Sequence, residues 1–335
     1  MSVTIKDVAR QAGVSVASVS RALNGHDSVT PETRQRIIDT AAKLRYTPHS
    51  AARSLITRRH DTIGFVLPEL HGEFFSELIR GVDHAARASR LHLLVSSSHG
   101  NATEASAALR AMLGRVDGLL LMSPHVDADT LANILPAQLP AVLINVPVDS
   151  AIHSSLRIDN HTGAFAMTRH LIERGHRHIA HITGPKENFD ASERERGYRD
   201  ALAQFAPKMT AQVIDGDFSE EAGQKAGEDI AAMKKRPDAV FAANDMMAVG
   251  CLFALTSAGL RVPQDVAVTG FDDIPIARFV RPSLTTMRVN IADLGERAAA
   301  TLITTLREGR PVHHTVLTPE LVLRDSCGAM PVDIS

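Results

Sequence analysis

The sequence predicts a small all-α unit at the N-terminus, followed by a larger α/β body of two doubly wound halves with parallel sheets. Two observations predict this fold class. Residues 4–44 contain three short amphipathic helical patterns and no strand pattern. From residue 62 onward, short apolar runs alternate with helical stretches, which is typical of parallel sheets covered by helices. At 335 residues the chain also exceeds what one ordinary core holds.

Composition indicates a soluble globular protein, with 44% hydrophobic and 22% charged residues. The two cysteines, Cys251 and Cys327, have no partner at short spacing, which argues against a disulfide framework and a CxxC metal site. The first seven residues lack the apolar segment of a secretory signal, and no run approaches the roughly 20 apolar residues of a membrane helix. We therefore expect a cytoplasmic protein without membrane association.

The net charge of −2 conceals an asymmetry between the two units. Residues 1–60 carry ten Lys or Arg and four Asp or Glu, which gives +6 there and −8 in the remainder. A basic module on an acidic body predicts polyanion binding through the module. Because a basic face can also be merely solvated, charge alone leaves both interpretations open.

The basic module has the signals of three helices. Thr4 caps the first helix, which carries Asp7 in its first turn and ends at Gly13. Ser15 caps a second helix that runs to Leu23, and so short a turn between two helices is the helix-turn-helix arrangement. A third helix begins at 30–32, where proline follows a capping residue. The stripe expected to be buried on it is Ile37, Ile38, Ala41 and Leu44.

The second helix has an outer surface suited to the DNA major groove. Val19, Ala22 and Leu23 fall on one side and pack inward. Arg21 suits guanine O6/N7, while small apolar side chains suit thymine methyl groups and hydroxyls suit phosphates. The outward residues are Ser15, Val16, Ala17, Ser18, Ser20 and Arg21. A generic three-helix bundle with a solvated Arg21 is the alternative.

The segments TIKDVARQAGVSVASVSRALNG and VTPETRQRIIDTAAKLRYTPHSAARSL resemble the DNA-binding head of the lactose-repressor (LacI/GalR) family without a gap from Thr4 to Leu55. The resemblance implies a helix-turn-helix domain at 1–47 and a hinge helix with linker at 48–60. Such a hinge orders only on DNA, and two of them from a dimer enter the minor groove, with Leu55 as the wedge. His49 and Arg53 replace amides common in the family. Further implied DNA contacts are Thr4, Asn24, His49, Ala52, Arg53 and Leu55.

In the body, the predicted strands are 63–67, 93–97, 118–122, 141–145, 178–183, 212–217, 239–243 and 266–270. In such folds a ligand binds where the carboxyl ends of the strands converge. The resemblance continues to about Arg324, through phrases such as SERERGYRDAL, PDAVFAANDMMAVGCLFAL and GLRVPQDVAVTGFDD. It implies a periplasmic-binding-protein-like body at 61–327. The N-subdomain would be 61–159 and 291–318, and the C-subdomain 160–288 and 320–327.

Matching positions imply effector contacts at seven residues, which lie after predicted strands or at helix starts. They are Glu73, Phe74, Asn145, Arg194, Phe218, Asn244 and Asp272. Amide, arginine and carboxylate groups beside aromatic rings suit a neutral polyhydroxylated ligand, so we expect a mono- or disaccharide. A purine or a phosphorylated metabolite is the alternative. Individual positions can also be structural, because Arg194 and Asp272 can form an ion pair and Asn244 can cap a helix.

Signals of other chemistry are weak. His176, His178 and His181 do not share one face and have no cysteine nearby, so we expect no metal. The chain contains no Gly-x-Gly, no GxxxxGK[ST] and no GxSxG, so we expect no cofactor and no enzyme activity.

The sequence therefore favours a DNA-binding transcription regulator, a repressor of carbohydrate-utilisation genes, under allosteric control by the effector. The alternative is a sugar-binding or sugar-processing α/β protein whose basic head has another use, and residues 1–55 favour the regulator. A homodimer on a pseudo-palindromic operator is expected. The segment after Cys327 lacks the leucine heptads that a tetramer would need.

Overall fold

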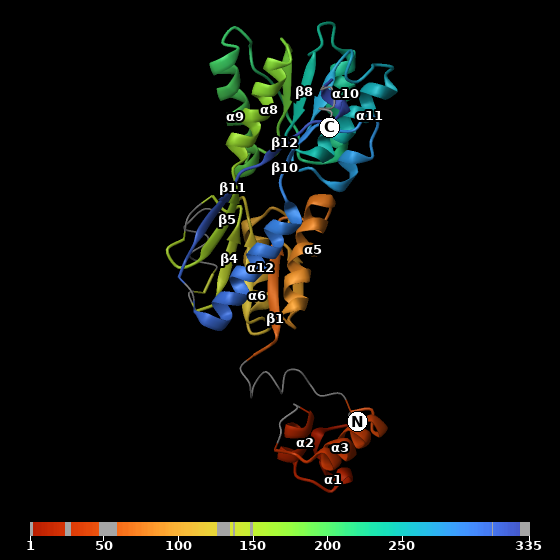
Figure 1. The fold of residues 1–335 in the computed structure, drawn as a ribbon, viewed down its shortest axis with the longest axis vertical. Helices are drawn as coiled ribbons and strands as arrows, with labels where there is room; N and C mark the ends of the chain where they lie inside the picture. The colour runs from red at the N-terminus through yellow and green to blue at the C-terminus, as the bar shows by residue number, and fades with distance from the viewer. Residues whose placement is uncertain are drawn as a thin grey trace, which may run out of the picture. The chain divides into compact units, whose positions relative to one another are not determined.

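The computed structural model describes residues 3–23, 28–46, 59–125, 135–136, 138–147, 150–309 and 311–328. It divides the chain into two compact units, Met1–His60 and Asp61–Ser335 (Figure 1). Within the described residues, no helix is long and apolar enough to cross a membrane.

The first unit contains three helices: α1 (Ile5–Ala12), α2 (Val16–Leu23) and α3 (Pro31–Lys43). The Asp7 carboxylate accepts hydrogen bonds from the backbone nitrogen and the hydroxyl of Thr4, and Gly13 ends α1 in the left-handed conformation at φ 63°. Ser15 caps α2 by accepting from the backbone nitrogen of Ser18 at 3.1 Å. The three helices therefore begin where the capping signals predict.

A small apolar core holds these helices together. Its fully buried members include Val8, Val19 and Ile37, one from each helix. The prediction that Ile38 is buried was wrong, because its side chain is 42% exposed. Ile37 and Ala41 lie four residues apart on the inner face of α3, and Ile38 lies about 100° further around the helix.

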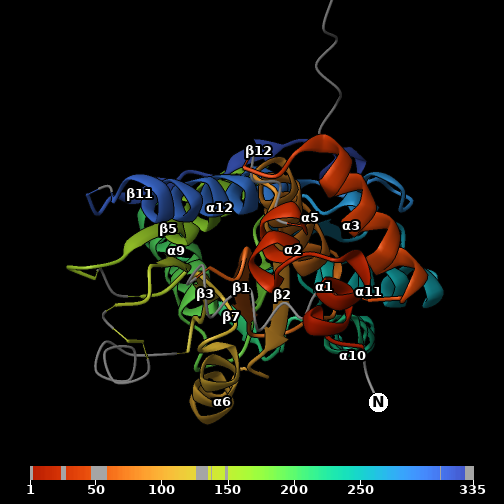
Figure 2. The ribbon, with the colours of Figure 1, turned by 90° about the horizontal axis from the view of Figure 1, so that it is seen from below.

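The body contains a six-stranded parallel sheet in the order β11-β5-β4-β3-β1-β2. These strands are β1 (Thr62–Leu67), β2 (His92–Ser97), β3 (Gly118–Met122), β4 (Ala141–Ile144), β5 (Ser154–Ile158) and β11 (His314–Leu317). Helices α5 (Glu73–Ala88) and α12 (Ile291–Glu308) cover one face, and α6 (Ala102–Met112) covers the other (Figure 2). Along β3, Leu120 packs with the first face and Leu119 with the second.

A second parallel sheet has the order β7-β6-β8-β9. Its strands are β7 (Gln212–Ile214), β6 (Ile179–Ile182), β8 (Ala239–Ala242) and β9 (Ala267–Thr269), flanked by α8 (Asn160–Glu173), α9 (Phe189–Phe205), α10 (Glu220–Ala232) and α11 (Asp245–Ser257). Figure 1 shows the two sheets with their helices as separate lobes of the body. The prediction of two doubly wound subdomains is confirmed.

The chain passes between the subdomains three times. It crosses from β5 to α8, from β10 (Thr286–Arg288) to α12, and from β11 to β12 (Glu320–Val322). Strands β10 and β12 pair antiparallel, and the short helices η1 (Pro275–Arg278) and η2 (Asp325–Cys327) belong to the C-subdomain. Asp273 joins two of these connections, because its carboxylate accepts from Arg288 Nε at the end of β10, at 2.7 Å, and from Arg324 after β12.

Glycines let paired helices approach closely. A Cβ atom at Gly250 of α11 would collide with the backbone oxygen of Glu220 in α10, and one at Gly223 of α10 would collide with Met247 in α11. A Cβ at Gly81 of α5 would collide with the backbone oxygen of Ala292 in α12. Backbones in contact fix the direction of each helix, and hence the place where α10 and α11 begin.

Candidate functional site

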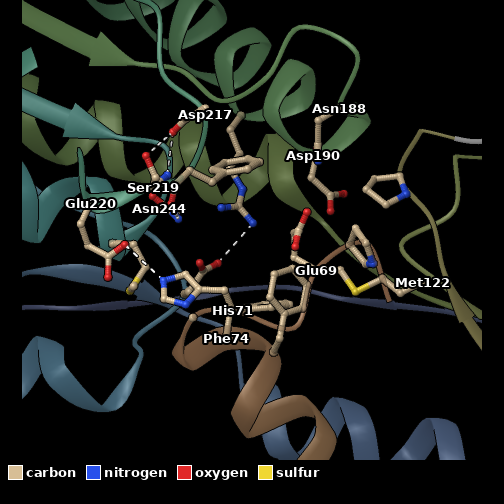
Figure 3. Close-up of a pocket in the computed structure, with 18 residues that line it drawn as sticks. Glu69, His71, Phe74, Met122, Asn188, Asp190, Asp217, Ser219, Glu220 and Asn244 are labelled. Carbon is tan, nitrogen blue, oxygen red and sulfur yellow. Dashed lines mark hydrogen bonds and ion pairs between the residues drawn. The ribbon is translucent and has the colours of Figure 1, made fainter. Parts of the chain in front are cut away.

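A cavity of about 370 Å³ lies between the two subdomains of the body (Figure 3). The loop after β1 and the start of α5 form one wall, and the ends of the C-subdomain strands form the other. Its volume lies within the range of about 300–1,000 Å³ typical of small-molecule sites. Five of the seven predicted effector residues line it: Phe74, Arg194, Phe218, Asn244 and Asp272.

Arg194, on α9, is the buried cation of the cavity. Its Nε donates to Asn160 Oδ1 at 2.8 Å, and Nη1 donates to the backbone oxygen of Ala243 at 2.5 Å. Its guanidinium carbon lies 3.8 Å from the ring centroid of Phe271 and 5.9 Å from that of Phe218. These contacts fix the guanidinium plane before any ligand arrives.

Asp272 faces this guanidinium from the end of β9. Its Oδ1 lies 3.2 Å from Arg194 Nη2, which is an ion-pair distance, and both side chains are about 95% buried. No hydrogen bond of good geometry reaches Asp272 Oδ1 within the described residues, so its contact with Arg194 is an ion pair. Because both groups are buried, the attraction between them is screened little by water.

Asp190 also lines the cavity, and the sequence interpretation missed it. It lies one helical turn before Arg194 on α9, and this i, i+4 spacing was the available signal. Its Oδ1 accepts from Asn160 Nδ2 at 2.8 Å and its Oδ2 from Asn145 Nδ2 at 3.0 Å. Asn145 is absent from the cavity wall and orients Asp190 from behind, while its own Oδ1 accepts from the backbone nitrogen of Ile158.

Burial changes the acidity of these two carboxyl groups. It raises the pKa of Asp190 to about 6 and that of Asp272 to about 7, against the opposing attraction of Arg194. The amide hydrogen bonds from Asn145 and Asn160 also lower the pKa of Asp190. Two carboxyl groups that titrate near neutral pH beside a buried arginine are typical of a functional site.

Asn244 and Phe218 form the wall at the start of α11. Asn244 caps this helix by accepting from the backbone nitrogen of Met247 at 3.0 Å, and its Nδ2 donates to the backbone oxygen of Phe218 at 2.9 Å. One amide hydrogen and one lone pair remain for a ligand. Asn244 therefore has the capping role and also lines the cavity.

Glu73 does not line the cavity. Its carboxylate accepts from the backbone nitrogen of Ile276 at 2.8 Å, and thus connects the start of α5 to η1 in the other subdomain. Two further contacts span the cleft: the backbone nitrogen of Phe189 donates to the backbone oxygen of Pro124 at 3.2 Å, and His125 Nδ1 lies 3.2 Å from the backbone oxygen of Glu187. Glu73 therefore holds the cleft edges together.

Some of the predicted effector residues have an uncommon backbone conformation. Three of the predicted effector residues have positive φ: Asn145 at 47°, Phe218 at 74° and Asp272 at 114°. Such conformations are costly for residues other than glycine and persist where the surrounding structure imposes them, often at binding sites.

In the head, α2 presents the predicted outward residues. Val16 is 40% exposed. Ser15, Ala17 and Arg21 are also exposed, whereas Ser18 and Ser20 are half-buried. Thr4 is exposed and donates its hydroxyl to Asp7. The remaining predicted DNA contacts, Asn24, His49, Ala52, Arg53 and Leu55, lie outside the described residues.

The histidines form no metal site where the structure is described, since no group of three His, Cys, Asp or Glu residues there could hold an ion. His181 is instead buried between the rings of Tyr198 and Phe241, with centroid distances of 5.1 Å and 4.9 Å.

A three-helix head with an exposed second helix, joined to a two-lobed body with a polar and aromatic cavity, is the arrangement of a DNA-binding transcription regulator with a ligand-binding domain. Residues 4–49 match the profile of bacterial regulatory proteins of the lacI family, and residues 168–327 match a periplasmic binding protein-like domain. The chain belongs to the LacI family.

Two curated relatives align over nearly the whole chain. The ribose operon repressor of Haemophilus influenzae is 34% identical over 327 residues, which cover 96% of this chain and 98% of the relative. The transcriptional repressor PurR of Photobacterium profundum is 33% identical, with the same coverage of both chains.

Solved structures agree with these relatives. The lac repressor dimer bound to operator and the anti-inducer ONPF has a TM-score of 0.86 at 27% identity, covering 98% of this chain and 100% of that one. The complex of the regulator CelR with cellobiose has a TM-score of 0.71 at 32% identity, covering 97% and 99%.

Proposed function

We propose that this regulator represses carbohydrate-utilisation genes in the cytoplasm and that a mono- or disaccharide bound in the cavity controls it. The observation that carries the proposal is the combination of Phe74 and Phe218 with the buried polar groups of Arg194, Asp190 and Asp272 around one cavity. Aromatic faces pack on the C–H side of a sugar ring, and carboxylate and amide groups hydrogen-bond to its hydroxyls.

The Asp272 carboxyl group supports this choice. Its buried Oδ1 is ion-paired with Arg194 but makes no hydrogen bond within the described residues, and a sugar hydroxyl that donates to it would add one. Asn244 retains one donor and one acceptor for an adjacent hydroxyl. Among the similar proteins, the CelR structure holds cellobiose.

On DNA, we propose that two chains place their α2 helices in successive major grooves of a pseudo-palindromic operator. Val16, Ala17 and Arg21 would contact bases, and Ser15, Ser18, Ser20, Thr4 and Asn24 would contact the backbone. The hinge, with His49, Ala52 and Arg53, would enter the minor groove with Leu55 as the wedge. The similar lac repressor structure is a dimer on its operator.

A purine is the second candidate effector. The cavity offers two aromatic rings, those of Phe74 and Phe218, that could stack on a purine. Buried carboxyl groups and amides can also hydrogen-bond to a purine edge. The two candidates therefore have to be separated by measurement.

The test is a calorimetric screen of the full chain against sugars and purines, with every binder added to an operator-binding assay. A sugar that binds and changes operator affinity supports the proposal, since effector and operator must change each other's affinity reciprocally. A purine that does so, with no sugar active, makes the second candidate correct. A version lacking residues 1–60 should bind the same ligand and lose the operator.

A further inference from the structure

Four helices begin at the cavity. The residues that precede them, Gly72 of α5, Asn188 of α9, Ser219 of α10 and Asn244 of α11, all line it (Figure 3). A helix N-terminus carries about half a positive charge and often binds phosphate through free backbone N–H groups. Taken alone, this convergence would favour an anionic ligand.

Three of these helix starts are already occupied by their own side chains. Asn188 accepts from the backbone nitrogen of Ala191 at 3.0 Å, and Ser219 accepts from that of Ala222 at 3.1 Å. Asn244 does the same for α11, as described above. The capped backbone nitrogens are therefore not available to a ligand phosphate.

Each of the four helices also carries an acidic residue in its first turn, and these are Glu73, Asp190, Glu220 and Asp245. Burial raises the pKa of Asp245 well above its ordinary value, so this side chain does not act as a full negative charge. A carboxylate at this position compensates the positive end of the helix dipole. When Asp190 and Asp272 are ionised, they compensate the guanidinium of Arg194 as well, because it faces both of them. The positive groups of the cavity are thus matched by groups of the chain itself.

Carboxyl groups are in excess around the cavity. Among its described lining residues are five of them, against one guanidinium and one imidazole. Three lie at the mouth: Glu69 is half exposed, Glu220 lies 3.9 Å from His71, and Asp217 is exposed and accepts from the hydroxyl of Ser219 at 2.5 Å. Even with Asp190 and Asp272 protonated, these three remain in the path of an incoming anion.

Asp272 favours a ligand that donates hydrogen bonds. This residue lines the cavity, and its buried Oδ1 is ion-paired with Arg194 but makes no hydrogen bond within the described residues. A fully ionised phosphate or carboxylate group has no hydrogen to donate to Asp272, whereas a hydroxyl or amino group has.

We propose that the cavity selects uncharged or cationic polyhydroxyl effectors, and that Glu69, Asp217 and Glu220 exclude their phosphorylated and carboxylated derivatives. The identity of the bound class rests on the proposed sugar-binding function. The exclusion of anions from the cavity does not, and it can be measured without any effector.

The first experiment measures the potential at the cavity directly. The chain has no tryptophan, so Phe74→Trp introduces a single fluorophore into the cavity wall of the full-length protein. Its fluorescence is quenched at low ionic strength by iodide, by neutral acrylamide and by the 1-methylnicotinamide cation. We expect the ratio of iodide to acrylamide quenching to be several-fold lower than for free N-acetyltryptophanamide. The ratio of 1-methylnicotinamide to acrylamide quenching should be higher than for the free fluorophore.

The matched variants are E69Q/D217N/E220Q at the mouth and E173Q/E296Q/D229N on outer helix surfaces, all at exposed or half-exposed carboxylates. Both sets change the net charge equally. The mouth set should raise iodide quenching toward the free-fluorophore value, and the outer set should leave it low. Equal iodide access in the parent protein, or an equal rise in both variants, would overturn the proposal.

The second experiment compares sugars with their own phosphate esters, such as glucose with glucose 6-phosphate and ribose with ribose 5-phosphate. Any sugar that binds should bind at least about tenfold more tightly than its ester, because like charges across a binding surface oppose association. The mouth variant should reduce the difference in affinity between the sugar and its phosphate ester, and the outer variant should not. An ester that binds as tightly as its parent sugar contradicts the exclusion. Iodide exclusion with no sugar bound supports it and refutes the proposed sugar effector.

Discussion

Asp272 sits where an ionised side chain reduces the stability of the folded protein. Burial raises its pKa to about 7, above the ordinary value of 3.8. The contribution of protonated Asp272 to the free energy of unfolding is therefore fully present below pH 3.8, and it is lost as the pH rises through 7. Binding sites often retain such residues at the expense of stability.

We therefore predict that Asp272→Asn stabilises the unliganded protein. The gain at pH 8 should be on the order of 1–3 kcal/mol, since one pKa unit corresponds to about 1.4 kcal/mol, and it should vanish near pH 4. Denaturant unfolding at both pH values measures it, and the effector response should be lost with operator binding retained. A loss of stability at pH 8 would mean that pairing with Arg194 outweighs burial.

His181 has the opposite pH dependence. Its Nδ1 lies 2.9 Å from the backbone oxygen of Phe241, and Nε2 has no partner among the described residues. Burial lowers the pKa of His181 from 6.5 to about 3. Its contribution to folding is thus present above pH 6.5 and is lost as the pH falls toward 3.

We predict that His181→Gln, which keeps a donor for Phe241 and has no titration, reduces the loss of stability between pH 6.5 and pH 4. The reduction should be on the order of 1–3 kcal/mol. Thermal unfolding across this range measures it, with His84→Gln as the control at an exposed position. Parallel pH profiles for the parent and His181→Gln would contradict the prediction.

The predicted effector residues show how much of the site can be predicted from the sequence. Strand ends and family motifs predicted a ligand site between the subdomains, and five of the seven predicted effector residues line the cavity there. Asn145 and Glu73 lie outside the cavity wall. Asn145 donates a hydrogen bond to Asp190, and Glu73 accepts one from the backbone nitrogen of Ile276. The motif fixes where a residue lies along the chain, whereas the direction of its side chain depends on partners 45 or 203 positions away.

Among the elements, the pair α10 and α11 places two helix starts at the cavity. We predict that Gly250→Ala forces these helices apart, because its Cβ would meet the backbone oxygen of Glu220. The free energy of unfolding should fall by about 1–3 kcal/mol, as for other overpacked sites. Effector affinity should also fall, because Ser219 and Asn244 move with their helices.

The control is Ser257→Ala on the exposed side of α11. Thermal unfolding and calorimetry separate the two effects. If Gly250→Ala behaves like Ser257→Ala in both measurements, the close approach of the helices is unimportant for the site.

All eight predicted body strands are present, but four others were missed. Strand β5 has the sequence SSLRI, and β11 is an exposed sheet edge. Strands β10 and β12 are three residues long and pair with each other across more than 30 positions. Short polar strands carry little periodicity, so only long-range pairing reveals them.

At the scale of the whole molecule, the contact of Glu73 with Ile276 holds the cleft closed across its edge. We predict that Glu73→Ala shifts the body toward an open cleft and weakens effector binding about three- to tenfold, since hydrogen bonds to charged groups contribute roughly 1.5–3 kcal/mol, partly retained by other contacts. Small-angle scattering and calorimetry measure the two effects.

Glu77→Ala, one turn further along α5, is the matched control because that carboxylate pairs with Arg80 on the same helix. It should change neither scattering nor affinity. Identical behaviour of the two variants would show that Glu73 does not restrain the cleft.

The chain crossings of the body have a genetic consequence. Residues 160–288 form one continuous insertion that carries Asp190, Arg194, Phe218, Asn244 and Asp272 together, and only β12 and η2 join this lobe from elsewhere. A single exchanged DNA segment would therefore transplant most of the proposed effector contacts into a related gene and leave the sheet beneath α5 and α12 intact. Recombination can diversify the signals to which such genes respond while their DNA targets stay the same.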